Sequence, residues 1–450
     1  MPLLLLAILT CGVSAYAQSA GIEGHWQGTL DAGAARLRLA LHIEKEASGS
    51  LSGKMDSIDQ GANGIPLSAV ALTEDRAVSF TIPAIGGSYK GKLNAAGDAI
   101  DGTWTQGPAS LPLGFRRGNT PADISKPQDP KKPYPYEERE VVFENSAQGN
   151  KLAGTLTVPK NAKSVPAVVL LTGSGPQNRD EALFGHRPFL VLADHLTRKG
   201  IAVLRFDDRG VGGSTAVPRS TTLDFAKDAI AAVEFLKKDP AINAARIGLI
   251  GHSEGGLMAP IAASQSKDVA FIVLLAGTGV PGEEVMYEQA AAIIRANGGN
   301  AEQVAANRQV QEKIFALVKS DLDDDAVREK VREAAGANQA AMAGSPWFRT
   351  FVKLDPRTYL RKLTCPVLAL NGELDLQVLP KQNLPEIEKA LKEGGNKDFK
   401  TAALPKLNHL FQTAEKGTPD EYARLDETIA PAALHAISDW ILEKTTPKGK

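Results

Sequence analysis

A serine, a carboxylate and a histidine each follow a strand-like segment of this chain. Ser253 lies in Gly251-His252-Ser253-Glu254-Gly255, directly after the strand-like run 246–250. A serine on a sharp strand-to-helix turn projects its hydroxyl from a sheet, and small residues two positions before and after let the backbone fold that tightly. The pattern therefore predicts a nucleophilic serine.

A nucleophilic serine needs a general base and an acid that orients it, because a free hydroxyl is almost wholly protonated near neutral pH. Asp375 follows the apolar run 366–370, and His409 lies on the loop after the strand-like stretch 399–404. The order serine, acid, histidine predicts Asp375 as the orienting acid and His409 as the base.

Other acids and histidines offer alternatives for these roles. Glu373 lies two residues before the predicted acid, and Glu283 and Glu284 follow the preceding strand. His186 is a possible residue of the site lining, although a lone histidine is more often structural. His252 adjoins the serine, but its backbone direction should point it away from the hydroxyl.

Acyl transfer also needs donors for the oxyanion, worth about 2.7–4 kcal/mol each when they are preorganised. One is expected to be the N–H of Glu254, the residue after the serine. The other is expected to be the N–H of Ser174, in a glycine loop after the apolar run 168–171, with Gly173 and Gly175 lining the site. A phosphate-binding P-loop is disfavoured because its Lys-Ser/Thr ending is missing.

These motifs, in this order, resemble the α/β-hydrolase superfamily. The segment 172–181 (Thr-Gly-Ser-Gly-Pro-Gln-Asn-Arg-Asp-Glu) looks like the signature of bacterial esterase and acyl-hydrolase relatives of the prolyl-oligopeptidase-like branch, although many relatives have His-Gly where this chain has Thr172-Gly173. The resemblance covers about residues 138–446. It implies an α/β fold, a mostly parallel central sheet with helices on both faces, and serine-dependent hydrolysis of carboxylic esters without a cofactor.

Two further segments of this region have expected roles. The loop 207–214 contains Asp207 and Arg209, which are expected to tie a tight turn by a charge-assisted hydrogen bond. Residues of about 281–360 lack strand signals and predict a helical cap inserted over the site. Its aromatic residues Trp347, Phe348 and Phe351 either face the acyl pocket or pack the helices together.

The part of the chain before the hydrolase divides into three segments. Residues 1–17 predict a signal peptide, because the apolar stretch 2–13 is too short to span a bilayer and Ala15-Tyr16-Ala17 follows it. Residues 18–118 alternate with period two and predict an accessory β-rich barrel or sandwich with its tryptophans in the core. Residues 119–137 are proline-rich and predict a stiff, extended linker.

Composition limits the classes of binding partner that are expected. The formal net charge is −1, so there is no basic excess and nucleic acid is an unexpected partner. No His-Glu-x-x-His or paired-cysteine pattern occurs, so no metal is expected, and the resemblance implies no other cofactor. The expected partner is a small-molecule ester, for a secreted or periplasmic protein with no membrane span after signal removal. Oligomeric state is left open.

Two alternative functions remain at this stage. A serine peptidase of the prolyl-oligopeptidase-like type would use the same three residues on an amide. A non-catalytic envelope-binding protein would use the β-rich segment to bind a ligand and the hydrolase domain as a scaffold. The three residues in order favour the carboxylesterase.

Overall fold

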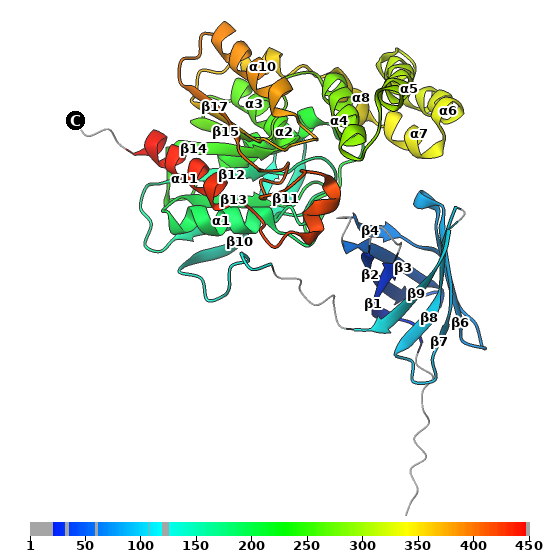
Figure 1. The fold of residues 1–450 in the computed structure, drawn as a ribbon. Coiled ribbons are helices and arrows are strands. Elements are labelled where there is room, and N and C mark those ends of the chain that lie inside the picture. The colour runs from blue at the N-terminus through cyan, green and yellow to red at the C-terminus, as the bar shows by residue number, and fades with distance from the viewer. Residues whose placement is uncertain (1–20, 32–35, 59–61, 108, 119–125, 447–450) are drawn as a thin grey trace, which may run out of the picture. The chain divides into compact units, whose positions relative to one another are not determined.

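The computed structural model describes residues 21–31, 36–58, 62–107, 109–118 and 126–446. The predicted signal peptide at 1–17 lies outside the described residues. The chain forms two compact units, one ending at Asp123 and the other beginning at Ile124. Figure 1 shows the first unit in blue to cyan and the second running from cyan to red.

The first unit is a nine-stranded sheet in which every pair of neighbours is antiparallel. In spatial order its strands are β4 (Ala62–Pro66), β3 (Leu51–Ser57), β2 (Arg36–Lys45), β1 (Gly24–Asp31), β9 (Ala109–Arg117), β8 (Ala99–Gln106), β7 (Gly87–Leu93), β6 (Ala77–Ile82) and β5 (Ser68–Leu72). Strand β5 also contacts β3, so the sheet curls back on itself.

Alternation along the strands builds the core of this unit. In β6, Val78, Phe80 and Ile82 are buried while the residues between them are partly exposed, as a period-two strand requires. Trp26 and Trp104 both lie in the same apolar core, and the indole N–H of Trp26 donates to the carbonyl of Ile22 at 2.8 Å. The tryptophans therefore pack the interior, as the sequence predicts.

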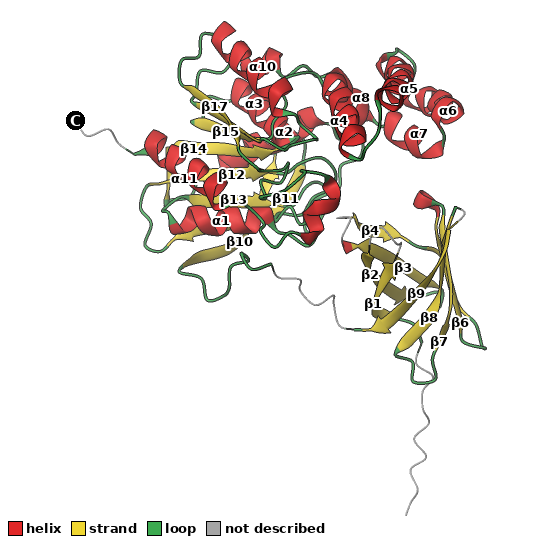
Figure 2. Ribbon diagram, viewed as in Figure 1, coloured by secondary structure: helices red, strands yellow, loops and turns green. Residues whose placement is uncertain are grey.

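The second unit contains an eight-stranded sheet, mostly parallel, with helices on both faces (Figure 2). In spatial order its strands are β10 (Tyr136–Asn145), β11 (Asn150–Pro159), β13 (Ala202–Phe206), β12 (Val165–Leu171), β14 (Ile242–His252), β15 (Phe271–Leu275), β16 (Val367–Gly372) and β17 (Phe399–Leu404). Each pair of neighbours from β13 through β12 to β17 is parallel, and β11 is antiparallel to both of its neighbours, β10 and β13. This is the α/β-hydrolase fold that the sequence predicts.

Each face of this sheet buries an apolar layer beneath helices. One layer includes residues of α2 (Thr222–Leu236), α3 (Gly255–Gln265) and α10 (Pro380–Glu393). The other includes residues of α1 (Pro188–Arg198) and α11 (Pro431–Thr445). Because both faces are covered, the central strands are continuously apolar rather than alternating.

Between β15 and β16 the chain forms only helices, in the place predicted for the cap. They are α4 (Gly282–Ala296), α5 (Ala301–Lys319), α6 (Asp324–Ala335), α7 (Ala337–Ala343), α8 (Pro346–Lys353) and α9 (Arg357–Leu360). A separate small core, including Phe315, Val318 and Phe348, joins several of these helices. In the described part of the chain, no helix combines the length and apolarity that crossing a bilayer requires.

The segment predicted as a linker differs from the expectation over part of its length. Residues 119–125 lie outside the described residues, but Lys126 and Gln128 pack onto the hydrolase unit. The Lys126 ammonium donates to the carbonyls of Ala423 and Leu425 at 3.1 and 2.6 Å. The Gln128 side chain bonds the backbone of Ile429. Polar side chains therefore fasten this proline-rich stretch, so it belongs to the second unit.

Candidate active site

The strands that carry the predicted residues run parallel and end at one edge of the sheet. Strand β12 leads into the glycine loop, β14 into Ser253, β16 into the segment of Asp375, and β17 into the loop of His409. In open α/β sheets, sites form outside the carboxyl ends of the strands. The topology therefore gathers residues more than 150 positions apart in the sequence into one region.

Ser253 occupies a strained turn between β14 and α3. Its φ is 53°, in the left-handed region that costs a non-glycine residue free energy and clusters at functional sites. The Ser253 N–H donates to the Leu275 carbonyl at 2.8 Å. A Cβ at Gly251 would lie 1.9 Å from the Gly255 carbonyl oxygen, and one at Gly255 would lie 2.1 Å from the Leu171 carbonyl oxygen. Glycine is thus required at both positions.

The structure brings Asp375 and His409 into direct contact. The His409 Nδ1 lies 2.9 Å from an Asp375 carboxylate oxygen, and the two residues are 4% and 1% exposed. The other Asp375 oxygen accepts from the backbone N–H groups of Gln377 and Val378 at 2.8 and 2.9 Å. These bonds fix the carboxylate, which in turn selects the imidazole tautomer whose Nε2 is free to accept a proton.

The hydroxyl of Ser253 is not hydrogen-bonded to His409 among the bonds of the described residues. The next residue back, His252, lies close to the base, since the His252 and His409 ring centroids are 4.9 Å apart. In enzymes without substrate, the bond between nucleophile and base is often long and tightens only in the complex. The elbow and the imidazole are therefore neighbours with the nucleophile–base bond unformed.

Both predicted oxyanion donors are uncommitted within the described part of the chain, where neither the Glu254 N–H nor the Ser174 N–H makes a hydrogen bond. By contrast, the Gly173 N–H donates to the Glu181 carboxylate at 2.7 Å. A Cβ at Gly173 would lie 3.4 Å from the Cβ of Ser253, so the glycine loop lies directly against the elbow. The geometry leaves two amides available for a charged oxygen.

The side chain of Glu254 connects the elbow to the cap. One of its carboxylate oxygens accepts from the Thr222 hydroxyl at 2.6 Å and from the Trp347 indole N–H at 2.7 Å. The Trp347 ring stacks on Phe351, with centroids 5.8 Å apart and planes 13° apart. Phe348 belongs to the small core of the cap, and Trp347 also packs against that core. The three aromatic residues thus divide between packing and the elbow.

Buried acids surround the elbow. Burial, helped by the nearby carboxyls of Glu254 and Glu181, raises the pKa of Asp208 to about 8, against hydrogen bonds from Gln177 and Thr172. Burial also raises the pKa of Glu254, against its bonds from Thr222 and Trp347. Since a raised pKa favours the neutral acid, the negative charge of Asp208 is reduced at neutral pH.

His186 lies elsewhere than the expected site lining. It is 1% exposed, with Nδ1 2.9 Å from the Thr428 hydroxyl and Nε2 2.9 Å from the Tyr422 carbonyl. Burial lowers its pKa to about 4, so the ring is neutral near pH 7. A ring enclosed in this way supports the segment after His409 and does not face substrate.

The alternative acids are also placed apart from His409. Glu373 is exposed and accepts from the backbone N–H of Lys406. Glu283 bonds Tyr287 and Lys319 within the cap, and the Glu284 carboxylate forms an ion pair with Arg357 at 4.0 Å. Asp375 is therefore the acid that the fold delivers to the imidazole.

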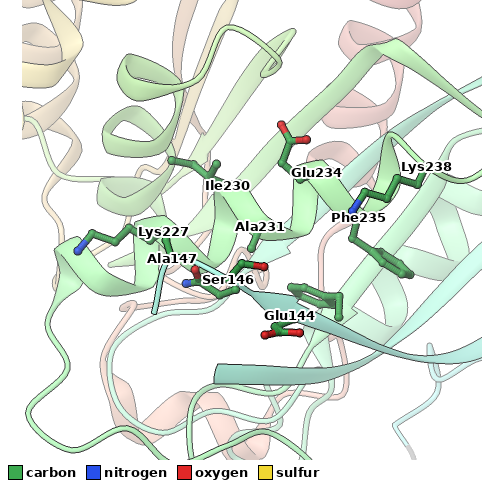
Figure 3. A pocket seen from close by; sticks show the side chains of 11 residues that line it. Glu144, Ser146, Ala147, Lys227, Ile230, Ala231, Glu234, Phe235 and Lys238 are labelled. Carbon is green, nitrogen blue, oxygen red and sulfur yellow. The ribbon is translucent and has the colours of Figure 1, made fainter. Parts of the chain in front are cut away.

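Two hollows on the second unit lie away from these residues. One of about 550 Å³ lies between the end of β10 and helix α2 and is lined by residues such as Phe143, Lys227 and Phe235 (Figure 3). Another of about 800 Å³ lies between α10 and β17. None of Ser253, Asp375 and His409 lines either hollow, so the chemistry is not located in them.

The sequence reasoning missed a residue of this region, Glu181. Its carboxylate accepts from Gly173 and lies 2.9 Å from the His252 ring, and it is 2% exposed. Its position as the last residue of the signature 172–181 was the available signal. A histidine within the elbow motif was a second signal, because a buried imidazole requires polar partners.

Comparison with known proteins agrees with this geometry. The family model described as X-Pro dipeptidyl-peptidase (S15 family) matches residues 148–405. The chain is 30% identical to Esterase EstD of Thermotoga maritima over 321 residues, covering 69% of each protein.

Solved structures similar to this chain include a Pyrococcus furiosus esterase, Pf2001, at 17% identity and TM-score 0.44, covering 69% of this chain and 91% of that one. A hypothetical protein of Pseudomonas aeruginosa, PA2218, is similar at 20% identity and TM-score 0.45, covering 72% and 98%. By the extent of its match to the family model and to Esterase EstD, the chain belongs to the S15 family and is a serine hydrolase with the α/β-hydrolase fold.

Proposed function

We propose that this protein is a carboxylesterase that acts through a covalent acyl-enzyme on Ser253. His409 is the general base and then the general acid, and Asp375 orients its imidazole. The observation that carries the proposal is the buried Asp375–His409 pair, 2.9 Å between heavy atoms, beside a serine held at φ 53°. Strain at the serine and a fixed imidazole serve no purpose in packing.

The reaction follows from the placed groups. His409 Nε2 takes the hydroxyl proton as Ser253 Oγ attacks the ester carbonyl carbon, and the carbonyl oxygen becomes an oxyanion facing the N–H groups of Glu254 and Ser174. The imidazolium then gives its proton to the leaving alcohol as the carbon–oxygen bond breaks. Water, deprotonated by the same imidazole, attacks the acyl-enzyme and releases the carboxylic acid and Ser253.

The second candidate, favoured by the family match, is cleavage after an X-Pro dipeptide. Such a substrate presents an α-ammonium, which calls for a free carboxylate near the serine. The two buried glutamates here are already occupied: Glu181 by Gly173 and His252, and Glu254 by Thr222 and Trp347. This arrangement, together with the relative named as an esterase, favours esters.

The test compares p-nitrophenyl esters of increasing acyl length with an X-Pro p-nitroanilide. We expect the wild-type protein to hydrolyse the short-chain esters and Ser253→Ala to abolish turnover while it remains folded by circular dichroism. Mass spectrometry should find the adduct of a fluorophosphonate on Ser253. Anilide hydrolysis with the higher kcat/KM would replace the esterase with the peptidase, and equal turnover by both proteins would refute the nucleophile.

We propose further that the protein is secreted or periplasmic and is cut after Ala17. The support is the short apolar stretch 2–13 followed by Ala15-Tyr16-Ala17. N-terminal sequencing of protein recovered outside the cytoplasm should begin at Gln18. An intact N-terminus on that protein would contradict the proposed cleavage.

A further inference from the structure

A buried glutamate and a histidine connect the two loops on either side of the elbow. A single carboxylate oxygen of Glu181 accepts from the Gly173 N–H at 2.7 Å and lies 2.9 Å from the His252 Nδ1. The other ring nitrogen of His252, Nε2, lies 3.0 Å from the backbone carbonyl oxygen of His409. The chain of contacts thus runs from the glycine loop, across the elbow, to the loop of the base.

The partners of this ring dictate its protons. A carbonyl oxygen only accepts, so His252 Nε2 must carry a hydrogen. The contact between Nδ1 and the Glu181 oxygen also needs one proton, on either the ring or the carboxyl. The pair therefore holds one proton beyond that of a neutral histidine beside a carboxylate, and it titrates as a unit. When that proton is lost with Nε2 still protonated, the lone pairs of His252 Nδ1 and the Glu181 oxygen face each other and repel.

We propose that Glu181 and His252 are positioning residues that, through one buried shared proton, hold the oxyanion loop at Gly173 and the backbone of His409 at fixed spacing. The inference rests on the proposed function, since it assigns to these groups the geometry of that reaction. A single anchor for both loops keeps the donors and the base in register around Ser253. A shift of about 1 Å in such groups can cost about 100-fold in rate.

The surroundings of the pair retain this proton. Burial by itself lowers the pKa of His252, but the charge of Glu181, the hydrogen bonds to Glu181 and to the His409 carbonyl, and the charge of Asp375 together raise it above its usual value. The charged or titratable groups facing the pair are Asp375, the His409 ring and, beside Glu181, Asp208.

Apolar side chains complete the enclosure of the pair. A cavity of only about 20 Å³ beside Glu181 and His252 is otherwise lined by apolar residues, including Phe189, Leu275 and Phe411. Because little water has access, the two partners must satisfy each other.

The raised pKa of His252 sets the direction of the pH effect. The bridge is complete below the ordinary histidine value of about 6.5 and is lost as pH rises through the higher value in the folded protein. The wild-type kcat should therefore decline on the alkaline side as the pair loses its proton. Asp208→Asn, measured in parallel, removes the neighbouring carboxyl whose pKa burial raises to about 8.

The first experiment needs no catalysis. In the Ser253→Ala protein, ¹⁵N-histidine NMR below pH 6.5 should show His252 Nε2 protonated and Nδ1 bonded to the shared proton, with a pKa above 6.5 for the loss of that proton. Adding Glu181→Gln should lower that pKa and speed hydrogen exchange of the Gly173 amide at least tenfold. A His252 pKa below 6.5 with Glu181 present, or unchanged exchange at Gly173, would overturn the proposal.

The second experiment measures ester hydrolysis by His252→Asn, His252→Gln and His252→Leu. By side-chain length, Asn can reach Glu181, Gln can reach the His409 carbonyl, and Leu can bond neither. We expect kcat to fall about 10- to 100-fold, most for Leu, with KM within about twofold of wild type. In these variants, the decline of kcat at alkaline pH that proton loss from the Glu181–His252 pair causes in the wild type should disappear.

His195→Gln is the matched control, because that half-buried histidine bonds Ser438 between α1 and α11 and should keep wild-type kcat. Variants of His252 that lose melting temperature but keep kcat would show a purely structural role and overturn the proposal. If the wild-type protein hydrolysed no ester, the proposed function would fail, and the NMR measurements would still decide whether the bridge exists.

Discussion

Asp375→Asn removes the charge of the orienting acid and keeps nearly the same side-chain shape. One oxygen of Asp375 accepts from the backbone N–H groups of Gln377 and Val378, and an amide oxygen can keep both bonds. The amide nitrogen then faces the Nδ1 of His409, where the carboxylate accepted before. A donor at that place forces the imidazole into the tautomer with its hydrogen on Nε2, which cannot take the proton of Ser253.

The expected loss follows from this change of tautomer. Wrong-tautomer imidazoles lower kcat by about 10⁴ in serine hydrolases, which corresponds to about 5.4 kcal/mol of transition-state stabilisation. Stability should change much less, because Asp375 is 1% exposed and keeps its backbone bonds. The new amide also meets the Asn371 amide, which lies 3.4 Å from the lost carboxylate oxygen, so a cost of about 1–3 kcal/mol is expected.

The assay is hydrolysis of p-nitrophenyl acetate at saturating substrate, with urea unfolding of the same samples. Glu373→Gln is the matched control: it makes the same change from carboxylate to amide at the exposed alternative acid. The control should keep wild-type kcat. If Asp375→Asn kept a tenth or more of the wild-type kcat while folded, or if Glu373→Gln lost as much, Asp375 would not orient the base.

Three further changes test the surroundings of the elbow. Gly255→Ala places a Cβ 2.1 Å from the Leu171 carbonyl oxygen, so we expect the free energy of unfolding in urea to fall by about 1–3 kcal/mol and turnover to fall. Stability and turnover equal to wild type would show that the turn relaxes freely. Because burial raises the pKa of Asp208 to about 8, the folded state retains a proton that the unfolded state loses above about pH 3.9, and stability declines as pH rises from about 4 to 8. Asp208→Asn should remove that part of the decline, seen as a growing advantage in melting temperature over wild type, and parallel curves would contradict it. Trp347→Phe keeps a ring beside Phe351 but removes the donor to Glu254, so a loss of about 1–3 kcal/mol is expected in urea, and unchanged stability would show that the bond contributes nothing.

The central strands were predictable because burial on both faces makes them continuous apolar runs. The apolar runs 168–171 and 366–370 lie almost wholly within β12 and β16. The stretch 399–404 coincides with β17, an edge strand that is only partly buried. Strand β10 gave no such signal, because it is an edge strand with mixed burial in which Val142 is 62% exposed. Local pattern thus located the strands whose ends carry Ser253, Asp375 and His409.

Partners distant in the sequence could not be predicted from local pattern. Asp207 and Arg209 were expected to bond each other across a short turn, but Asp207 pairs with Arg179 and Arg209 with Asp228. Both observed pairs join separate elements, so no spacing within the turn encodes them. The enclosure of His186 by Tyr422 and Thr428 was hidden for the same reason.

The buried acids around the elbow pose an electrostatic problem, because an oxyanion must form among them. Three arrangements act to reduce the negative charge. Glu181 shares a proton with His252, burial raises the pKa of Asp208 to about 8, and burial raises the pKa of Glu254 against its two hydrogen bonds. The same acids anchor the glycine loop and the cap residue Trp347. As pH rises, these acids acquire charge and the Glu181–His252 bridge is lost, so repulsion and the released glycine loop should both destabilise the developing oxyanion before the fold itself is lost.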